Sequence, residues 1–425
     1  RNIYTFRCFS FSSFTCSVTS ASRVFELSDK FIEISNEGMW FVKFYAPWCA
    51  HCRRLEPVWA HVAQTLYNTP IKVAKVDCTR FSSVATHFNV RAYPTIFIKG
   101  SFRHEYFGER MKDEMVNYAM RMSQPAVQRV SQTDSIAYLK EMHSVFFGYT
   151  GKQQGPLWEM FTLNADKYQP HSWFYAMSHE LVKNEIKLPN ETCIFVYKED
   201  DVFFFDVNPE HLEDRETLNA TLDKWINVEK FGFFPKITRS NINQLMDTEK
   251  YIVIAVVSEN KLNEITQTER DFKDMIEGII RKKKRELHPH FQFGWMGSPD
   301  LANSIAMYEL TVPHLLVLNS TTSHHHIPDD DPVLMTPEAV ALFLDQIHNQ
   351  IAPTYGGNHW PVRIYRGFYE ARSTLISMWR GNPVLTALVF GLPLGFLSLI
   401  CYSICCADIL DAEEEEQEET HEKKD

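Results

Sequence analysis

The chain has 425 residues, enough for about three domains of 100 to 150 residues that each bury a core. Its hydrophobic content of 44% and aromatic content of 13% are typical of globular protein and exclude a disordered chain. The formal net charge is -11, but residues 408–425 hold ten acidic residues and two lysines, so the other 407 residues carry only -3. No basic stripe is present, which argues against a nucleic-acid partner.

The first 22 residues are typical of the end of a signal peptide, with Ala21 in a small-residue cleavage context. Three N-x-[ST] triplets, at Asn190, Asn219 and Asn319, are candidate glycosylation sites. Together, the leader and the triplets predict a lumenal body.

Three blocks with similar element order follow the leader, at residues 23–125, 126–228 and 229–353. In the first block the sequence predicts strands at 39–46, 71–78 and 93–100, and helices at 52–67, 82–88 and 112–122. In the second block it predicts a strand at 144–150, a hairpin at 188–206 and a helix at 216–226. In the third it predicts strands at 251–259 and 311–319 and helices at 269–287 and 338–351. The repeat of about 105 residues predicts three copies of one α/β fold, each with a mixed sheet covered on both faces.

Two features of these blocks carry further predictions. Pro94, Pro189 and Pro313 each stand just before a predicted strand, where a cis X–Pro bond is expected. The segment "SHHHIPDDDP" (323–332) is interpreted as a polar loop, because adjacent histidines on a loop offer no preformed metal geometry.

Residues 381–407 contain 27 consecutive uncharged residues, long enough to cross a bilayer. A juxtamembrane linker (354–380) precedes this segment and the acidic tail (408–425) follows it. Arginines stand before the span and acids after it, against the positive-inside tendency. A cleaved leader and a large translocated body override that bias, so we expect a single-pass type I membrane protein.

Cys49 and Cys52 form a CxxC in "FYAPWCAHC", at a predicted strand-to-helix turn. The first sulfur then faces free N–H groups and the positive end of the helix dipole, which favour the thiolate. His51 adds a donor or a positive charge, and Cys52 lies one turn further along the helix. We therefore expect Cys49 to be the nucleophile and Cys52 the resolving thiol.

Two other interpretations of the pair are weaker. A structural zinc site needs a second pair of ligands, and Cys78 and Cys193 each stand alone as expected buried thiols. A disulfide closing such a small ring would constrain the unfolded chain little. No metal and no cofactor is predicted.

"FYAPWCAHC", with the later "VAKVDC", "VRAYPT" and "GERMKDEMVNY", resembles the catalytic domain of the protein disulfide isomerase family, which has the thioredoxin fold. One such domain, two redox-silent thioredoxin-like domains, one span and a lysine-bearing tail resemble the thioredoxin-related transmembrane group of that family. The resemblance therefore implies three tandem thioredoxin-like domains followed by a transmembrane helix.

The resemblance also implies roles for further residues. Trp48 would pack beside the cysteines, and Pro94 would be a cis-proline facing Cys49. The backbone of Tyr93 would pair with an extended client segment. Arg110 corresponds to an arginine that can approach the resolving cysteine and lower its pKa. Lys75 corresponds to a lysine that pairs with a buried acid beneath the site.

This sequence departs from the family at two positions. Ala50 replaces a glycine, which we expect to alter redox poise or client access only modestly. Lys43 replaces the buried acid that takes the proton from the resolving cysteine. A neutral Lys43 would serve as the base, or a charged Lys43 would stabilise the Cys52 thiolate. In either case we expect client release to be retuned rather than abolished.

Lys423 and Lys424 resemble a dilysine retrieval signal of the endoplasmic reticulum, although Glu422 stands where a lysine is expected. The resemblance thus implies an oxidoreductase or isomerase in that membrane, acting on unfolded, cysteine-containing secretory clients and recharged by an unknown lumenal oxidant or reductant. Two alternatives stay open. One is a chaperone or adaptor with weakened exchange, and the other is a dedicated reductase.

Overall fold

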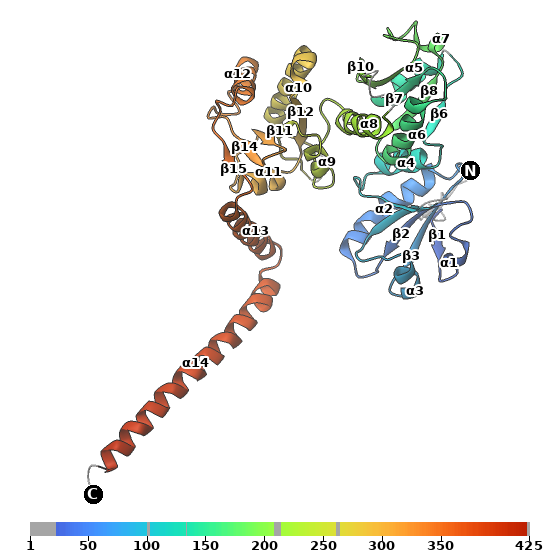
Figure 1. The fold of residues 1–425 in the computed structure, drawn as a ribbon. Coiled ribbons are helices and arrows are strands. Elements are labelled where there is room, and N and C mark those ends of the chain that lie inside the picture. Colours follow the sequence, from blue (N-terminus) through green and yellow to red (C-terminus); the bar gives the residue numbers. More distant parts are fainter. Residues whose placement is uncertain (1–22, 100–102, 133, 208–213, 261–263, 423–425) are drawn as a thin grey trace, which may run out of the picture. The chain divides into compact units, whose positions relative to one another are not determined.

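The computed structural model describes residues 23–99, 103–132, 134–207, 214–260 and 264–422 (Figure 1). The expected leader (1–22) lies outside these residues. The described chain forms three five-stranded sheets. It divides into two compact units near Gly232, the first with two sheets and the second with the third sheet and the C-terminal helices. The predicted α/β class is confirmed; the predicted domain boundaries at 125, 228 and 353 stay predictions.

The first sheet has the strand order β1-β3-β2-β4-β5. Its strands are β1 (Phe25–Leu27), β2 (Met39–Tyr45), β3 (Ile71–Asp77), β4 (Thr95–Lys99) and β5 (Arg103–Glu105). β1, β2 and β3 pair in parallel, whereas β4 and β5 are antiparallel. Its helices are α1 (Phe31–Ile34), α2 (Ala50–Thr65), α3 (Ser82–His87) and α4 (Lys112–Met122). They lie in pairs over two separate cores, α2 with α4 and α1 with α3, so the sheet is covered on both faces as predicted.

Helix α2 carries the CxxC, and its packing fixes where that motif lies. Leu55, Trp59 and Val62 recur at helical spacing and are buried against the sheet. The Trp59 ring lies 4.9 Å from that of Phe41 in β2, and its indole N–H donates to the Ala74 carbonyl in β3 at 3.2 Å. The start of α2 is therefore anchored above the ends of β2 and β3.

The second sheet has the order β10-β9-β7-β8-β6 and contains no CxxC. Its strands are β6 (Val127–Arg129), β7 (Val145–Thr150), β8 (Trp173–Met177), β9 (Cys193–Lys198) and β10 (Asp201–Phe204). Its helices are α5 (Asp134–Met142), α6 (Pro156–Tyr168), α7 (His179–Val182) and α8 (Arg215–Glu229). The β9–β10 hairpin and α8 confirm the sequence prediction, whereas β6, β8 and α6 were not predicted.

The third sheet has the order β12-β11-β13-β14-β15. Its strands are β11 (Tyr251–Val256), β12 (Phe291–Met296), β13 (His314–Asn319), β14 (His324–His326) and β15 (Tyr355–Gly356). Its helices are α9 (Ile242–Met246), α10 (Gln267–Leu287), α11 (Pro299–Ala306) and α12 (Pro337–His348). A capping box between Thr266 and Glu269 starts α10.

Two sequence predictions in these blocks were wrong in part. The expected loop at 323–332 begins with strand β14, because His325 and His326 pair with β13 and are buried. Cis bonds precede Pro94 and Pro313 as predicted, whereas the bond before Pro189 is trans.

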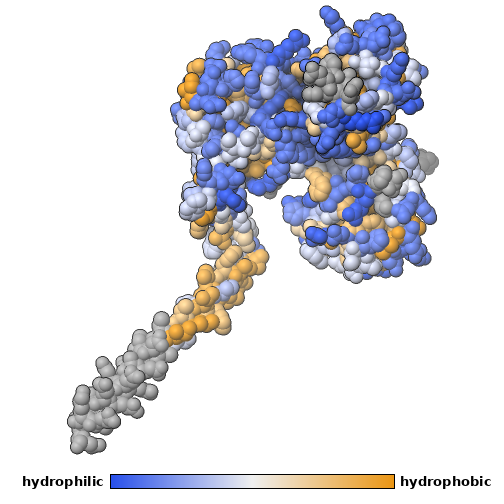
Figure 2. All heavy atoms as spheres, in the orientation of Figure 1, coloured by the Kyte–Doolittle hydropathy of each residue, from blue (hydrophilic) through white to orange (hydrophobic). Residues whose placement is uncertain are grey.

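Two helices follow the third sheet. The expected juxtamembrane linker contains α13 (Trp360–Gly381), and α14 runs from Pro383 to Glu422. Within α14 the segment Pro383–Ile404 is long and apolar enough to cross a membrane, close to the predicted 381–407. Figure 2 shows its apolar colouring.

Candidate active site

Cys49 stands between the end of β2 and the start of α2, as the N-cap of that helix. Its Sγ accepts the backbone N–H of Cys52 at 3.2 Å, which satisfies one of the free donors at the helix start. The same sulfur lies 3.6 Å from the Tyr93 carbonyl oxygen, to which its S–H donates. Both cysteines are free thiols, 7% and 2% exposed. Cys49 is therefore the more exposed of the two buried thiols.

The two thiols differ in acidity. Burial opposes ionisation of Cys49, but hydrogen bonds from the Cys52 thiol and from the backbone of Cys52 and His51 outweigh it and lower the pKa of Cys49. Burial and the hydrogen bond to Cys49 raise the pKa of Cys52 to about 11. Cys49 is therefore the thiol that ionises first, in line with its predicted role as nucleophile.

The other two cysteines of the sheets lack such an environment. Burial raises the pKa of Cys78 to about 11, and burial also raises the pKa of Cys193. Both are buried, and the Cys193 sulfur lies 3.2 Å from the Thr150 hydroxyl. Both thiols are thus buried, as predicted, and their raised pKa disfavours the reactive thiolate.

Four predicted residues form the rim around Cys49. Trp48 is 71% exposed, and its ring meets that of Tyr93 edge-on at 6.1 Å. Arg110 donates to the Pro94 carbonyl at 3.4 Å. Its positive charge also helps to lower the pKa of Cys49. The structure thus brings Trp48, Tyr93, Pro94 and Arg110 to one place.

Beneath Cys52 lies a cluster of charges. Lys43 in β2 is fully buried, and its register partner in β3 is Lys75. The Glu56 carboxylate lies between them, with one oxygen accepting from Lys43 and the other from Lys75 at 3.0 Å. The rings of Tyr45 and Trp59 lie 5.5 Å and 5.9 Å from the Lys43 ammonium. An acid from α2 therefore offsets the repulsion between two neighbouring lysine ammonium groups.

These contacts set the ionisation of the cluster. Burial lowers the pKa of Lys43 and Lys75 lowers it further, although Glu56 opposes the shift. Burial alone would raise the pKa of Glu56, but hydrogen bonds from both lysines outweigh it and lower that pKa. Glu56 and Glu26 outweigh burial at Lys75, whose pKa is raised. Glu56 is therefore held as a carboxylate between the two lysines.

Sequence reasoning missed Glu56, although it left a signal. Glu56 follows Cys52 by four residues, which places both on one face of α2. Lys75 does pair with an acid beneath the site, as the resemblance implied, but that acid comes from the helix and not from the position of Lys43 in β2.

The remaining predicted residues lie apart from this cluster. Ala50 begins α2, and exposed His51 bonds Arg54 at 3.1 Å through its Nδ1. Asn190 is exposed, Asn219 accepts from Asn164 at 2.8 Å, and Asn319 accepts from the N–H groups of the turn after β13. The retrieval residues Lys423 and Lys424 lie outside the described residues.

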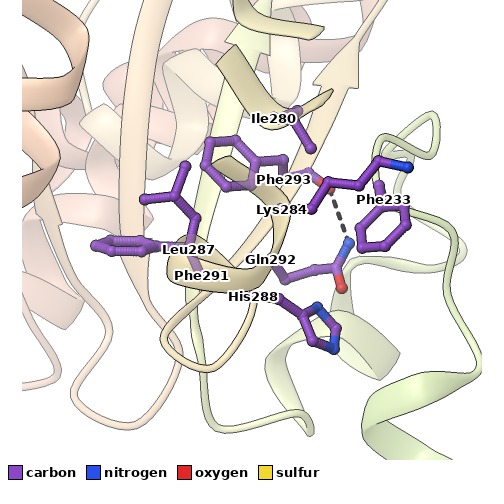
Figure 3. Close-up of a pocket in the computed structure, with 8 residues that line it drawn as sticks. All are labelled: Phe233, Ile280, Lys284, Leu287, His288, Phe291, Gln292 and Phe293. Atoms are coloured by element: carbon purple, nitrogen blue, oxygen red, sulfur yellow. Dashed lines mark hydrogen bonds between the residues drawn. The ribbon is translucent and has the colours of Figure 1, made fainter. Parts of the chain in front are cut away.

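Among the described residues, no group of three or more His, Cys, Asp or Glu side chains is placed to hold a metal ion. A pocket between α10 and β12 in the second unit is lined mainly by apolar and aromatic side chains, with Gln292 donating to the Phe293 carbonyl at 2.9 Å (Figure 3). Its lining includes no cysteine and no acid.

Two family models match parts of this chain. The family model described as Thioredoxin matches residues 24–121, and that described as Thioredoxin-like domain matches residues 151–346. Protein disulfide-isomerase TMX3 of Xenopus laevis is 34% identical over 95% of this chain and 87% of its own length. The Homo sapiens protein of that name is 32% identical over 94% of this chain and 88% of its own. The chain belongs to the TMX3 group of protein disulfide isomerases.

Solved structures also show similarity to parts of this chain. One of them is the solution structure of the first thioredoxin domain of mouse Protein disulfide-isomerase A4, which is 35% identical in sequence. The match covers 25% of this chain and 79% of the solved chain, with a TM-score of 0.23.

Membership of the TMX3 group explains the layout of the chain. The chain has a thioredoxin domain with a CxxC at the start of α2, then a thioredoxin-like region and one apolar C-terminal helix, and it is a membrane-anchored thiol–disulfide oxidoreductase. This confirms the predicted family, fold class and enzyme class.

Proposed function

We propose that this oxidoreductase acts in the lumen of the endoplasmic reticulum on cysteines of folding secretory proteins, with Cys49 as nucleophile and Cys52 as resolving thiol. The difference in acidity between the two thiols carries the assignment, because exchange begins with the thiol that ionises first. The Lys423–Lys424 tail and the three sequons support that compartment.

The reaction proceeds in two steps. The Cys49 thiolate attacks a client disulfide, forms a mixed disulfide and releases one client thiolate. The Cys52 thiolate then attacks the Cys49 sulfur and releases the second client thiolate, leaving an oxidised enzyme and a reduced client. The reverse sequence oxidises a client dithiol, and a lumenal oxidant or reductant sets the direction.

Client segments would dock along the rim. The Tyr93 carbonyl lies 3.6 Å from the Cys49 sulfur, so an extended client segment paired with the Tyr93 backbone would bring its sulfur to Cys49. Exposed Trp48 gives this strand an apolar neighbour. The bond from Arg110 to the Pro94 carbonyl holds the loop in place.

Lys43 acts on the second step as a cation. Its charge lowers the pKa of Cys52, against burial and against the neighbouring Cys49, which raise it. Glu56 stabilises the protonated form of Lys43 through a direct hydrogen bond. Of the two roles open for Lys43, the Glu56 contact favours the charged one. Lys43 and Glu56 are thus positioning residues for the departure of the Cys52 proton.

Alkylation of the full chain tests the nucleophile. At pH 6 we expect iodoacetamide to label Cys49 at least tenfold faster than Cys193, because the pKa of Cys49 is lowered and that of Cys193 is raised. Equal rates would favour the weakened chaperone. A redox potential near -180 mV would then support an isomerase, and one near -270 mV a reductase.

Two variants test the role of Lys43. The release of a preformed Cys49 mixed disulfide is followed from pH 6 to 9 in the parent chain, Lys43→Met and Glu56→Gln. A cationic Lys43 predicts slower release at neutral pH in both variants, since each removes the charge or its support. A neutral base predicts slower release in Lys43→Met but equal or faster release in Glu56→Gln, because losing the carboxylate favours neutral Lys43.

A further inference from the structure

Helix α13 carries a stripe of large apolar side chains along one face. Taking 100° per residue, six of them fall within about a third of a turn of each other. All six are exposed, between 37% and 74%: Trp360, Ile364, Phe368, Leu375, Met378 and Trp379. We call this set the apolar stripe.

The opposite face of α13 rests on the third sheet's unit. Val362, Arg366 and Tyr369 are half-buried there. Arg366 donates to the Gly357 carbonyl at 3.4 Å, next to β15. Glu370 accepts from the Ser304 hydroxyl of α11 at 3.0 Å. These contacts fix the rotation of α13, so the apolar stripe faces away from the protein body to which the helix is attached.

The apolar stripe lies directly beside the membrane span. α13 ends at Gly381, and Asn382 is extended, with φ -157° and ψ 92°. The candidate span begins at Pro383, one residue later. Trp379 therefore stands four residues from the start of a segment that crosses the bilayer, and the helix end cannot leave the membrane surface.

We propose that α13 lies on the bilayer surface next to the span, with the apolar stripe buried at the boundary of headgroups and acyl chains. The stripe has a tryptophan at each end, and tryptophan is enriched at that depth. Four arginines and one glutamate give the helix a net charge of +3. Arg363 and Arg372 flank the stripe, where they can reach lipid phosphates while their stems lie along the apolar layer.

The charge pattern disfavours a second copy of this chain as the occupant. Two stripes facing each other would bring the flanking arginines of both helices together, and like charges repel. A phospholipid surface instead offers phosphates to those arginines and an apolar layer to the stripe.

One consequence concerns the body of the protein. Because α13 is bonded through its other face to Gly357, next to β15, and to α11, burial of the apolar stripe would hold the third sheet at the membrane rather than on a free tether.

Tryptophan fluorescence of the full chain in phosphatidylcholine vesicles tests this placement. None of the nine tryptophans lies in the span Pro383–Ile404, so the part of the quenching by lipids brominated on the upper acyl chain that Trp360→Phe/Trp379→Phe removes is due to these two residues. We expect partial quenching in the parent chain and its loss in Trp360→Phe/Trp379→Phe. In Ile364→Glu/Phe368→Glu the quenching should fall by at least half, while the matched exposed control Ser377→Glu keeps it.

Two results would overturn the proposal. The first is a parent chain whose tryptophans are not quenched. The second is quenching that Ile364→Glu/Phe368→Glu leaves unchanged. Crosslinking between copies that is lost in this double variant, without any quenching in the parent, would assign the stripe to a second copy instead. Hydrogen exchange of β11 and β13 peptides confirms that the second unit of each variant is folded.

Discussion

Lys43 in β2 and Lys198 in β9 are both fully buried, and each ammonium bonds a glutamate from a helix. They differ in the acid. The side chain of Glu56 is 47% exposed and also bonds Lys75, whereas that of Glu229 is 8% exposed and lies 2.7 Å from Lys198. Burial lowers the pKa of both lysines.

The comparison separates a structural ion pair from one that can take part in chemistry. The Lys198–Glu229 pair is buried, and its sheet contains no CxxC. Its charges therefore affect only the stability of the fold. The Lys43–Glu56 pair has a resolving thiol on one side and solvent on the other, so its protonation can change while the fold persists.

Replacing the buried acid Glu229 with alanine should have the largest effect on the free energy of unfolding. Glu229→Ala leaves Lys198 in the core without this carboxylate, at an expected cost of about 3–5 kcal/mol. Hydrogen exchange of β7 and β9 peptides in the full chain measures it. Lys198→Met/Glu229→Leu is the matched control and should recover most of the loss. A cost below about 1 kcal/mol for Glu229→Ala would mean that the Lys198–Glu229 pair does not differ from the Lys43–Glu56 pair in its effect on stability.

Replacing the half-exposed acid Glu56 with alanine should cost less free energy of unfolding. Glu56→Ala is expected to destabilise the first sheet by about 1–2 kcal/mol, because water can take the place of a carboxylate that already reaches solvent. Exchange of β2 and β3 peptides reports this loss. A cost equal to that of Glu229→Ala would mean that the Lys43 site is as sealed as the Lys198 site.

Low pH should remove the contribution of Glu56 to the stability of the fold. Its pKa is lower in the folded state than the ordinary 4.5, so its stabilisation is fully present above that pH and is lost as pH falls through the folded value. The stability difference between the parent chain and Glu56→Gln should therefore be constant from pH 7 to 5 and shrink below 4.5. Urea unfolding at a series of pH values measures it, and a difference that grows on acidification would contradict the sign.

The outermost acid of the cluster should matter least. Glu26 bonds Lys75 at 3.2 Å but is 77% exposed, so Glu26→Gln should change stability by at most about 0.5 kcal/mol. It should also leave the release rate of the mixed disulfide unchanged. Any slowing comparable to that of Glu56→Gln would show that net charge, rather than the contact with Lys43, controls that step.

Local patterns predicted much of the fold. Helix α4 has the bounds expected from its apolar spacing, and α8 and α10 lie within a few residues of their predictions. Helix α6 was missed although Leu157, Phe161 and Ala165 recur at helical spacing. β14 was taken for a loop, because its strand character comes from pairing with β13 and β15, which sequence periodicity does not contain.

The candidate site divides in the same way. The nucleophile and the resolving thiol follow from a local motif. The contact of Glu56 depends on the register that sets Lys43 beside Lys75 and on how α2 lies over the sheet. Both depend on contacts between residues far apart in the sequence. The sequence therefore predicted that the family's acid is missing from β2, but not that Glu56 of α2 takes its place.

The closeness of Cys49 and Cys52 also protects Cys49 against oxidative damage. A peroxide would convert the acidic Cys49 to a sulfenic acid before it reached the other thiols of the sheets. Cys52, whose backbone N–H already bonds the Cys49 sulfur at 3.2 Å, can condense with that sulfenic acid, forming a disulfide and expelling water. The product is the ordinary oxidised form of the enzyme, so the geometry that serves exchange also diverts Cys49 from irreversible over-oxidation.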